Sequence, residues 1–103
     1  MARTAVCRAG DMADVPLRSV TIGDRQILLA RVGGELFAAG NLCTHKGCRL
    51  SGGRIEGGTI LCPCHKLGFD LRTGKVVAGK EAEAGPLPVF SVSVEGDEIF
   101  VEI

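Results

Sequence analysis

The chain has 103 residues, a length that fits a single domain spanning residues 1–103 with a modest hydrophobic core. Its 12 Lys and Arg residues balance its 12 Asp and Glu residues, and this absence of a basic field argues against nucleic acid as a partner. The longest aliphatic run, residues 27–30, is too short to span a bilayer, and residues 1–14 resemble neither a signal peptide nor a membrane anchor. We therefore expect a soluble, cytoplasmic protein that is a monomer on its own.

Short segments of strand character alternate with glycine-containing turns along most of the chain. In chain order the expected strands are residues 4–8, 18–22, 25–32, 36–39, 59–61, 68–71, 75–77, 89–94 and 98–103. The hairpin turn signals are Gly23-Asp24, Gly33-Gly34, Gly57-Gly58, Thr73-Gly74 and Gly96-Asp97. In residues 89–94 every second side chain can face a core, and no stretch has a convincing helical period, although residues 9–13 can form a short turn. The pattern predicts an all-β fold, either an antiparallel sandwich or a small barrel.

Two short motifs in the middle of the chain each combine cysteine with histidine. One reads C-T-H at residues 43–45 and the other reads C-P-C-H at residues 62–65. Two thiolates and two imidazoles fit a two-iron, two-sulfide cluster in which one iron takes both sulfurs and the other takes both nitrogens. A zinc site accepts the same donors but usually places like ligands together, and buried Cys and His without a metal are a further alternative. The candidate ligands are Cys43, His45, Cys62 and His65.

The use of histidine has a consequence for charge. Two ferric ions, two sulfides, two thiolates and two neutral imidazoles sum to zero, whereas four thiolates would leave a charge of minus two. A neutral oxidised centre accepts an electron more readily than an anionic one. Neither motif provides an open metal position or a substrate pocket, which indicates electron transfer rather than catalysis.

The spacing Cys-x-His…Cys-x-x-His resembles the ligand signature of Rieske proteins. The order of hairpins, two ligand loops, the Gly-Pro-rich loop at residues 85–88 and a closing hairpin is similar to that of small Rieske ferredoxins over nearly the whole chain. The resemblance implies one [2Fe-2S] cluster per chain, bound by an insertion at about residues 42–70 on a larger sheet body. It also implies that the loop containing Pro86 covers the cluster from a third side.

The resemblance extends to two further cysteines. Cys48 and Cys64 occupy positions similar to those of the cysteines that form a disulfide between the ligand loops in cytochrome bc-type Rieske proteins. A Cys48–Cys64 bond is implied here, and it would be worth about 3 kcal/mol in the chain-entropy model. The alternative is a pair of reduced thiols, because the cytosol disfavours disulfides. Cys7, in the first strand, is expected to be a small buried hydrophobe.

The second loop departs from the bc-type pattern. Leu67 stands where that pattern has serine and Phe69 where it has tyrosine, so two hydroxyl donors toward cluster and ligand sulfurs are missing. Because such donors raise the reduction potential, we expect a low or intermediate value. The chain is similar in this respect to ferredoxins that carry electrons from a reductase to the terminal oxygenase of aromatic-ring hydroxylating systems.

The resemblance also indicates where partners dock. Lys46 and Lys66 follow the two histidines, which in the family lie near the surface, and we expect them to attract an acidic patch on a partner together with Leu67. The alternative is that both are ordinary solvated lysines with no role in docking. Leu67, with Leu50 and Leu87, is expected to form an apolar collar around the cluster or to belong to the core.

Two polar groups near the loops are expected to have structural roles. Asp70 is predicted to pair with Arg72 and stiffen the base of the second loop. Asn41, just before the first ligand, is predicted to cap a turn through its side chain.

Three functions compete on these grounds. The first is a one-electron carrier that is not itself an enzyme and serves a reductase and a terminal oxygenase. The second is the Rieske small subunit of a larger oxidoreductase, of the nitrite reductase or arsenite oxidase type. The third is a zinc-stabilised binding module, which would be colourless.

Overall fold

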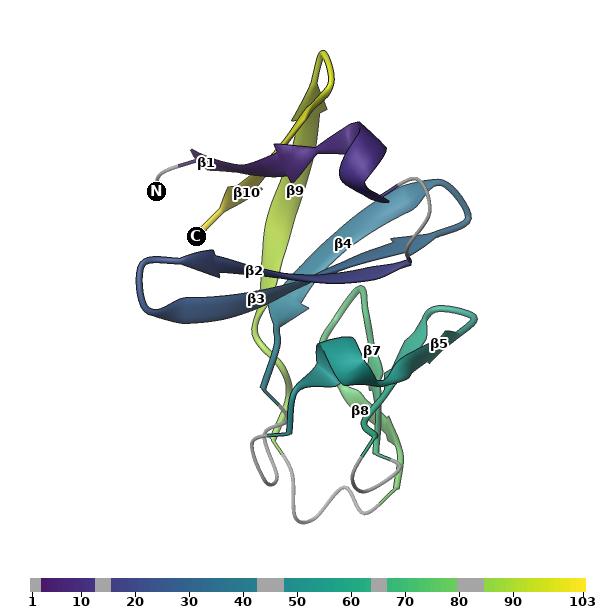
Figure 1. Ribbon diagram of the computed structural model, residues 1–103. Coiled ribbons are helices and arrows are strands. Elements are labelled where there is room, and N and C mark those ends of the chain that lie inside the picture. Colours follow the sequence, from purple (N-terminus) through teal and green to yellow (C-terminus); the bar gives the residue numbers. More distant parts are fainter. Residues whose placement is uncertain (1–2, 13–15, 43–47, 64–66, 80–84) are drawn as a thin grey trace.

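The computed structural model describes residues 3–12, 16–42, 48–63, 67–79 and 85–103, and these residues form two antiparallel sheets (Figure 1). Within these ranges the only helices are two short 3-10 turns, η1 (Ala9–Met12) and η2 (Leu50–Gly52). The prediction of an all-β fold is confirmed, and residues 9–12 form the short turn expected there. None of the described helices has the length and apolar character needed to cross a membrane.

The larger sheet has six strands in the order β1-β10-β9-β4-β3-β2. β1 and β2, at the two ends of this order, also contact each other, so the sheet curls into a nearly closed barrel. Its strands are β1 (Arg3–Arg8), β2 (Leu17–Ile22), β3 (Arg25–Val32), β4 (Glu35–Gly40), β9 (Val89–Glu95) and β10 (Glu98–Glu102).

The smaller sheet lies between β4 and β9 in the sequence, which makes it an insertion in the larger one. It has the order β5-β6-β7-β8 and continues past residue 70 as far as Ala78. Each strand has only three residues: β5 (Arg54–Glu56), β6 (Thr59–Leu61), β7 (Gly68–Asp70) and β8 (Val76–Ala78). β5 was not predicted because Ile55 is its only apolar residue and cannot show an alternating pattern.

Strand β3 of the larger sheet is buried on both faces and contributes to two hydrophobic cores. Ile27 and Leu29 point into the barrel core, together with Met12, Ile99 and Val101. Leu28 and Ala30, on the opposite face, contribute to a second core shared with the smaller sheet. This double burial explains why residues 27–30 read as a continuous aliphatic run rather than as an alternation.

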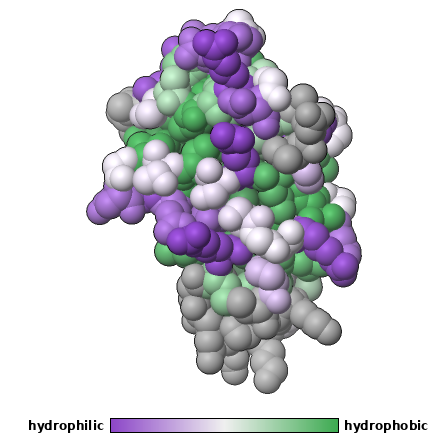
Figure 2. Space-filling model, viewed as in Figure 1, coloured by the Kyte–Doolittle hydropathy of each residue, from purple (hydrophilic) through white to green (hydrophobic). Residues whose placement is uncertain are grey.

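The alternation predicted for residues 89–94 holds only in part. Phe90 and Val92 pack against the barrel core, but Val94 is 48% exposed. β9 pairs with β4 only at Val89 and Phe90, so the rest of that edge has no neighbouring strand among the described residues. Val94 lies at the end of β9, near the tip of the β9–β10 hairpin, where Figure 2 shows mainly hydrophilic residues. The expected turn at Gly96-Asp97 is present, with Gly96 at φ +63°.

The Gly-Pro-rich loop ties the two sheets together. The Leu87 amide donates at 2.7 Å to the carbonyl of Gly74, in the connection between β7 and β8, and the Gly40 amide in β4 donates to the carbonyl of Pro88 at 2.9 Å. Leu87 is buried in the core shared by the sheets, whereas Pro86 is exposed. The loop is therefore fixed by backbone bonds on both sides and by one buried side chain.

Candidate metal centre

The first Cys-His motif lies on a loop whose base is closed by backbone pairing. Leu42 and Arg49 form an isolated antiparallel bridge, which brackets residues 43–48. The Leu50 amide donates to the carbonyl of Asn41 at 2.7 Å and adds a second tie just outside that bridge. Both ends of the loop are thus held at one place in the fold.

Asn41 fixes this base to the barrel and is itself fully buried. Its Oδ1 accepts a hydrogen bond from the Ser51 amide in η2 at 2.9 Å, and its Nδ2 donates to Ser19 Oγ at 3.3 Å and to Gln26 Oε1 at 3.4 Å. The predicted capping role is confirmed by the bond to Ser51. No local pattern indicates the links to β2 and β3, because they join residues far apart along the chain.

The second motif lies at the turn between β6 and β7. Leu61 pairs with Gly68, and the Cys62 amide donates to the carbonyl of Leu67 at 2.7 Å, so residues 63–66 are enclosed by an antiparallel base. Cys62 is 3% exposed. The two loops that carry the motifs are therefore closed in the same way, each by antiparallel backbone pairing at its base.

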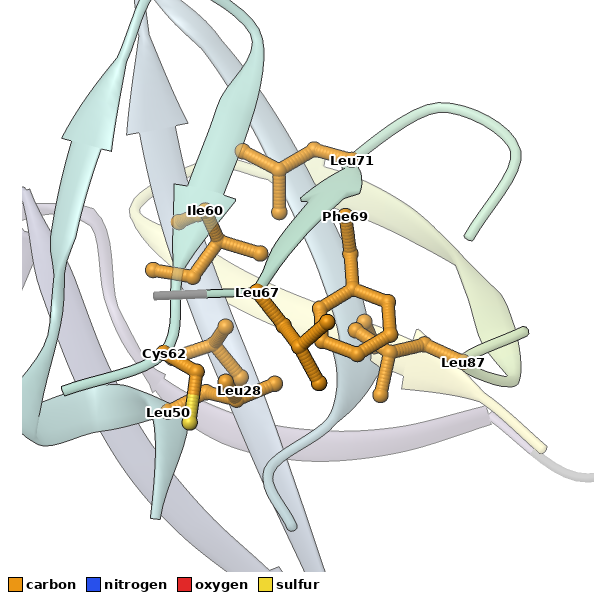
Figure 3. Packing of buried hydrophobic residues seen from close by; sticks show 10 residues of the cluster. Leu28, Leu50, Ile60, Cys62, Leu67, Phe69, Leu71 and Leu87 are labelled. Atoms are coloured by element: carbon orange, nitrogen blue, oxygen red, sulfur yellow. The ribbon is translucent and has the colours of Figure 1, made fainter. Parts of the chain in front are cut away.

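The bases of both loops meet at one apolar core. Figure 3 shows Cys62 among Leu28, Leu50 and Leu67, and all four belong to one buried cluster. The same cluster includes Leu87 of the Gly-Pro-rich loop, and the half-buried Cys48 packs against it. The structure thus brings the two loop bases and the third loop together around the side of the core that carries Cys62.

Several predicted site residues lie outside the described part of the chain. Of the predicted ligands the structure describes Cys62, and of the predicted disulfide it describes Cys48, which is disulfide-bonded. The partner of Cys48 is not among the described residues, so its pairing with Cys64 stays a prediction. The predicted site residues outside the described ranges are Cys43, His45, Lys46, Cys64, His65 and Lys66.

The three leucines of the expected collar are core residues. Leu50, Leu67 and Leu87 are 0%, 2% and 3% exposed, and Phe69 is also fully buried. The inclusion of Leu67 in a docking surface is therefore corrected: its side chain fills the space beside Cys62 and is not presented to a partner. Burial of Leu67 and Phe69 keeps that side of the core free of hydroxyl groups.

The predicted Asp70–Arg72 ion pair is also corrected. Asp70 Oδ1 instead accepts hydrogen bonds from the backbone amides of Arg72 at 2.7 Å and Thr73 at 3.3 Å. The Arg72 guanidinium reaches back to β4, where it pairs with Glu35 at 2.9 Å and lies over the ring of Phe37 at 5.1 Å. Asp70 thus caps the β7–β8 turn, as short acidic side chains do, and Arg72 links the two sheets.

Cys7 is half-buried rather than fully buried, and it packs against the barrel core as a small apolar side chain. Burial raises the pKa of its thiol above the ordinary value, and this effect outweighs the lowering by Arg18. Cys7 is therefore held as a neutral thiol, and it packs against a different core from the one that contains Cys62.

Comparisons with known proteins show the family of this chain. The family model of the Rieske [2Fe-2S] domain matches residues 2–93. The chain belongs to the Rieske [2Fe-2S] domain family. The ferredoxin component of biphenyl 2,3-dioxygenase from Rhodococcus jostii (strain RHA1) is 37% identical over 103 residues, which cover 100% of this chain and 94% of that protein.

Two solved structures have the same fold. The Sphingomonas yanoikuyae B1 ferredoxin superposes with a TM-score of 0.87 at 26% identity and covers 99% of both chains. A chain in the complex of reduced oxygenase and oxidized ferredoxin in carbazole 1,9a-dioxygenase superposes with a TM-score of 0.85 at 34% identity, over 96% of this chain and 91% of that one. The similarity therefore extends over nearly the whole molecule.

The described residues fit a Rieske cluster. Cys62 offers a soft sulfur donor from the buried side, and the cluster of buried residues around it is apolar throughout. Such surroundings penalise a net charge, so they suit a centre whose oxidised form is neutral. Cys62 with Cys43 would hold one iron and His45 with His65 the other, and the bound cluster would supply reversible one-electron chemistry.

Sequence reasoning missed two residues that shape the site. Ser51 is an ordinary polar residue in the sequence, and its amide matters only because Asn41 lies against it. Gly79 has φ +92° and packs against Leu67, where a Cβ would come within 2.5 Å of Leu67 Cδ2. Neither role has a local signal, although a glycine after a strand was a hint of a special backbone conformation.

Proposed function

We propose that this protein is the ferredoxin of a ring-hydroxylating dioxygenase system, which takes single electrons from a reductase and delivers them to a terminal oxygenase. One observation carries the proposal: the match to the biphenyl 2,3-dioxygenase ferredoxin component spans this whole chain and 94% of that relative. A chain that matches a ferredoxin component over nearly the whole of both proteins is expected to have the same function. The complex of oxygenase and ferredoxin among the similar structures supports an oxygenase as the recipient.

The architecture is suited to an electron carrier. The barrel and the smaller sheet support the site, because the bases of the two ligand loops meet at the core that the two sheets share. Leu50, Leu67 and Leu87 exclude water from the inner side of the site. The chain's own contribution is to hold the ligands, keep one side dry and present the opposite side to partners. We infer a cytoplasmic location, which cell fractionation would test.

Two properties of the site belong to the same proposal. Cys48 and Cys64 form a disulfide that joins the two ligand loops, and the bonded state of Cys48 supports this pairing. The reduction potential is low or intermediate, because the buried side chains at positions 67 and 69 carry no hydroxyl. Alkylation in denaturant without reductant, followed by mass spectrometry, tests the first property: three modified cysteines support the disulfide and five exclude it.

Lys46 and Lys66 are proposed to guide partner docking. Replacing both with glutamate should slow electron transfer to the oxygenase about tenfold at low salt, since charges at a docking rim act mainly on association. The matched control replaces Arg18 and Lys75, two exposed cations outside the ligand loops, with glutamate and has the same net charge change. Equal rates and equal salt dependence in the two double variants would reject the docking role.

Reconstitution tests the function as a whole. Purified protein is mixed with NADH, the reductase and the oxygenase of a biphenyl dioxygenase system, and dihydroxylated product is measured with and without it. The proposal predicts product only when the ferredoxin is present and reduced. A reducible cluster that takes electrons from the reductase but passes none to the oxygenase would contradict it.

A further inference from the structure

We infer that Asn41 is a positioning residue for the cluster: its buried amide locks the first ligand loop to the barrel in one orientation. The inference rests on the proposed Rieske function but concerns a residue that is not a ligand. Asn41 is the only fully buried polar or charged side chain among the described residues. A buried amide is retained only where its hydrogen bonds are made, because an unpaired polar group inside the protein is costly.

The hydrogen bonds of Asn41 connect three parts of the fold that must keep a fixed relation. Oδ1 holds the Ser51 amide in η2, which directly follows the first ligand loop. Nδ2 holds Ser19 in β2 and Gln26 in β3, which belong to the barrel. One side chain therefore joins the far end of the loop to the larger sheet.

The backbone of the same residue adds two more ties. The Asn41 amide donates to the carbonyl of Gln26 at 3.1 Å, and the Asn41 carbonyl accepts from the Leu50 amide at 2.7 Å. Gly40, one residue earlier, is bonded to Pro88 and so joins the Gly-Pro-rich loop to the same point. Asn41 is thus where the first ligand loop, the third loop and the barrel are linked, two residues before Cys43.

The amide group of asparagine suits this position better than the side chains of aspartate or alanine. It accepts on one atom and donates twice on the other, which matches one backbone amide on one side and two side-chain oxygens on the other. Aspartate would keep the acceptor but lose both donors and bury a negative charge. Alanine would leave the Ser51 amide without its partner and free the side of η2 that faces the barrel.

The first measurement compares Asn41→Ala with Val101→Ala, a core truncation in the barrel that leaves the loop bases untouched. Both variants are expected to lose stability. Only Asn41→Ala is expected to shift the g-values of the dithionite-reduced protein and to speed bleaching of the cluster at least tenfold. Bleaching and EPR spectra that match wild type, or that change equally in Val101→Ala, would overturn the inference.

A second measurement does not read the cluster itself. In the purified holoprotein, hydrogen exchange at the Leu50 and Ser51 amides is expected to be at least tenfold faster in Asn41→Ala than in wild type, with β9 and β10 unchanged. Equal protection of these two amides would also overturn the inference. If Asn41→Ala does not fold, the double variant Ser19→Ala plus Gln26→Ala replaces it, since this variant removes both acceptors of Nδ2. It should show smaller changes in g-values, bleaching rate and hydrogen exchange, in the same direction. The absence of any such change would count against the role of Asn41. Wild-type protein that never assembles a cluster would refute the proposed function instead.

Discussion

Gly79 provides a sharp test of how the second ligand loop is held. A Cβ added there would lie 2.5 Å from Leu67 Cδ2 and 3.2 Å from Leu67 Cα, and the backbone has φ +92°. The Leu67 carbonyl accepts the hydrogen bond from Cys62 that closes the loop. Replacing Gly79 with alanine should therefore strain the backbone and push Leu67 away from its place beside Cys62.

The magnitude follows from two contributions. A left-handed backbone costs a residue with a Cβ about 1–2 kcal/mol, and forcing extra volume against a packed core adds about 1–3 kcal/mol. Gly34→Ala is the matched control, because Gly34 has φ +85° and a Cβ added there would meet no atom within 4 Å, so it should show the backbone contribution alone. We expect Gly79→Ala to be less stable than Gly34→Ala by about 1–3 kcal/mol.

Anaerobic urea unfolding followed by circular dichroism measures this difference, and visible absorbance measures cluster loss. Each kcal/mol corresponds to about 4–8 °C in Tm for a domain of this size, so thermal unfolding provides a second reading. Gly79→Ala should also bleach faster than Gly34→Ala. Equal stability and equal bleaching of the two variants would refute the claim that Leu67 is wedged between Gly79 and the base of the loop.

Three further results are expected. Phe69→Tyr should raise the midpoint potential by about 40–80 mV in a redox titration, through a hydrogen bond from the new hydroxyl toward the site. Such a bond is worth about 1–2 kcal/mol, and a tenfold change in an equilibrium constant corresponds to 59 mV for one electron. An unchanged potential would show that position 69 does not tune it. Cys7 should react with iodoacetamide more slowly in folded than in denatured protein, because burial raises the pKa of its thiol, and equal alkylation rates would contradict this expectation. The neutral thiol contributes to stability below the ordinary thiol pKa, and this contribution is lost as the pH rises through the raised pKa. Arg72→Ala should cost about 1 kcal/mol or less, because its pair with Glu35 is exposed, and a loss of several kcal/mol in urea unfolding would show that this link between the sheets matters more than its exposure indicates.

Local patterns predicted most of the fold. Glycine-containing turns bounded the strands, and β3 and β6 were predicted with the bounds that the structure gives. Strand identity follows from short-range alternation and turn chemistry, which a single sequence displays. β5 escaped because a three-residue strand with one apolar residue carries no such pattern.

The site was less predictable, because its geometry depends on contacts between distant residues. The two motifs predict the ligand types, and this stays a prediction because Cys62 alone of the four ligands lies among the described residues. The burial of Leu67 depends on Gly79 and the core around it, which no local pattern indicates. Arg72 was expected to bind its near neighbour Asp70 and instead reaches Glu35, which lies on another sheet. A prediction from sequence favours a partner close along the chain, whereas the fold brings the distant Glu35 next to the Arg72 guanidinium.

EPR of the dithionite-reduced protein, combined with iron and sulfide analysis, tests the central claim most directly. The bases of two loops, closed at Leu42–Arg49 and at Cys62–Leu67, meet at one apolar core, and we propose that these loops bind a single cluster with mixed cysteine and histidine ligands. The account predicts two irons and two acid-labile sulfides per chain and a rhombic signal of low average g. Colourless protein that binds zinc and contains no acid-labile sulfide, purified under conditions that permit cluster assembly, would contradict it.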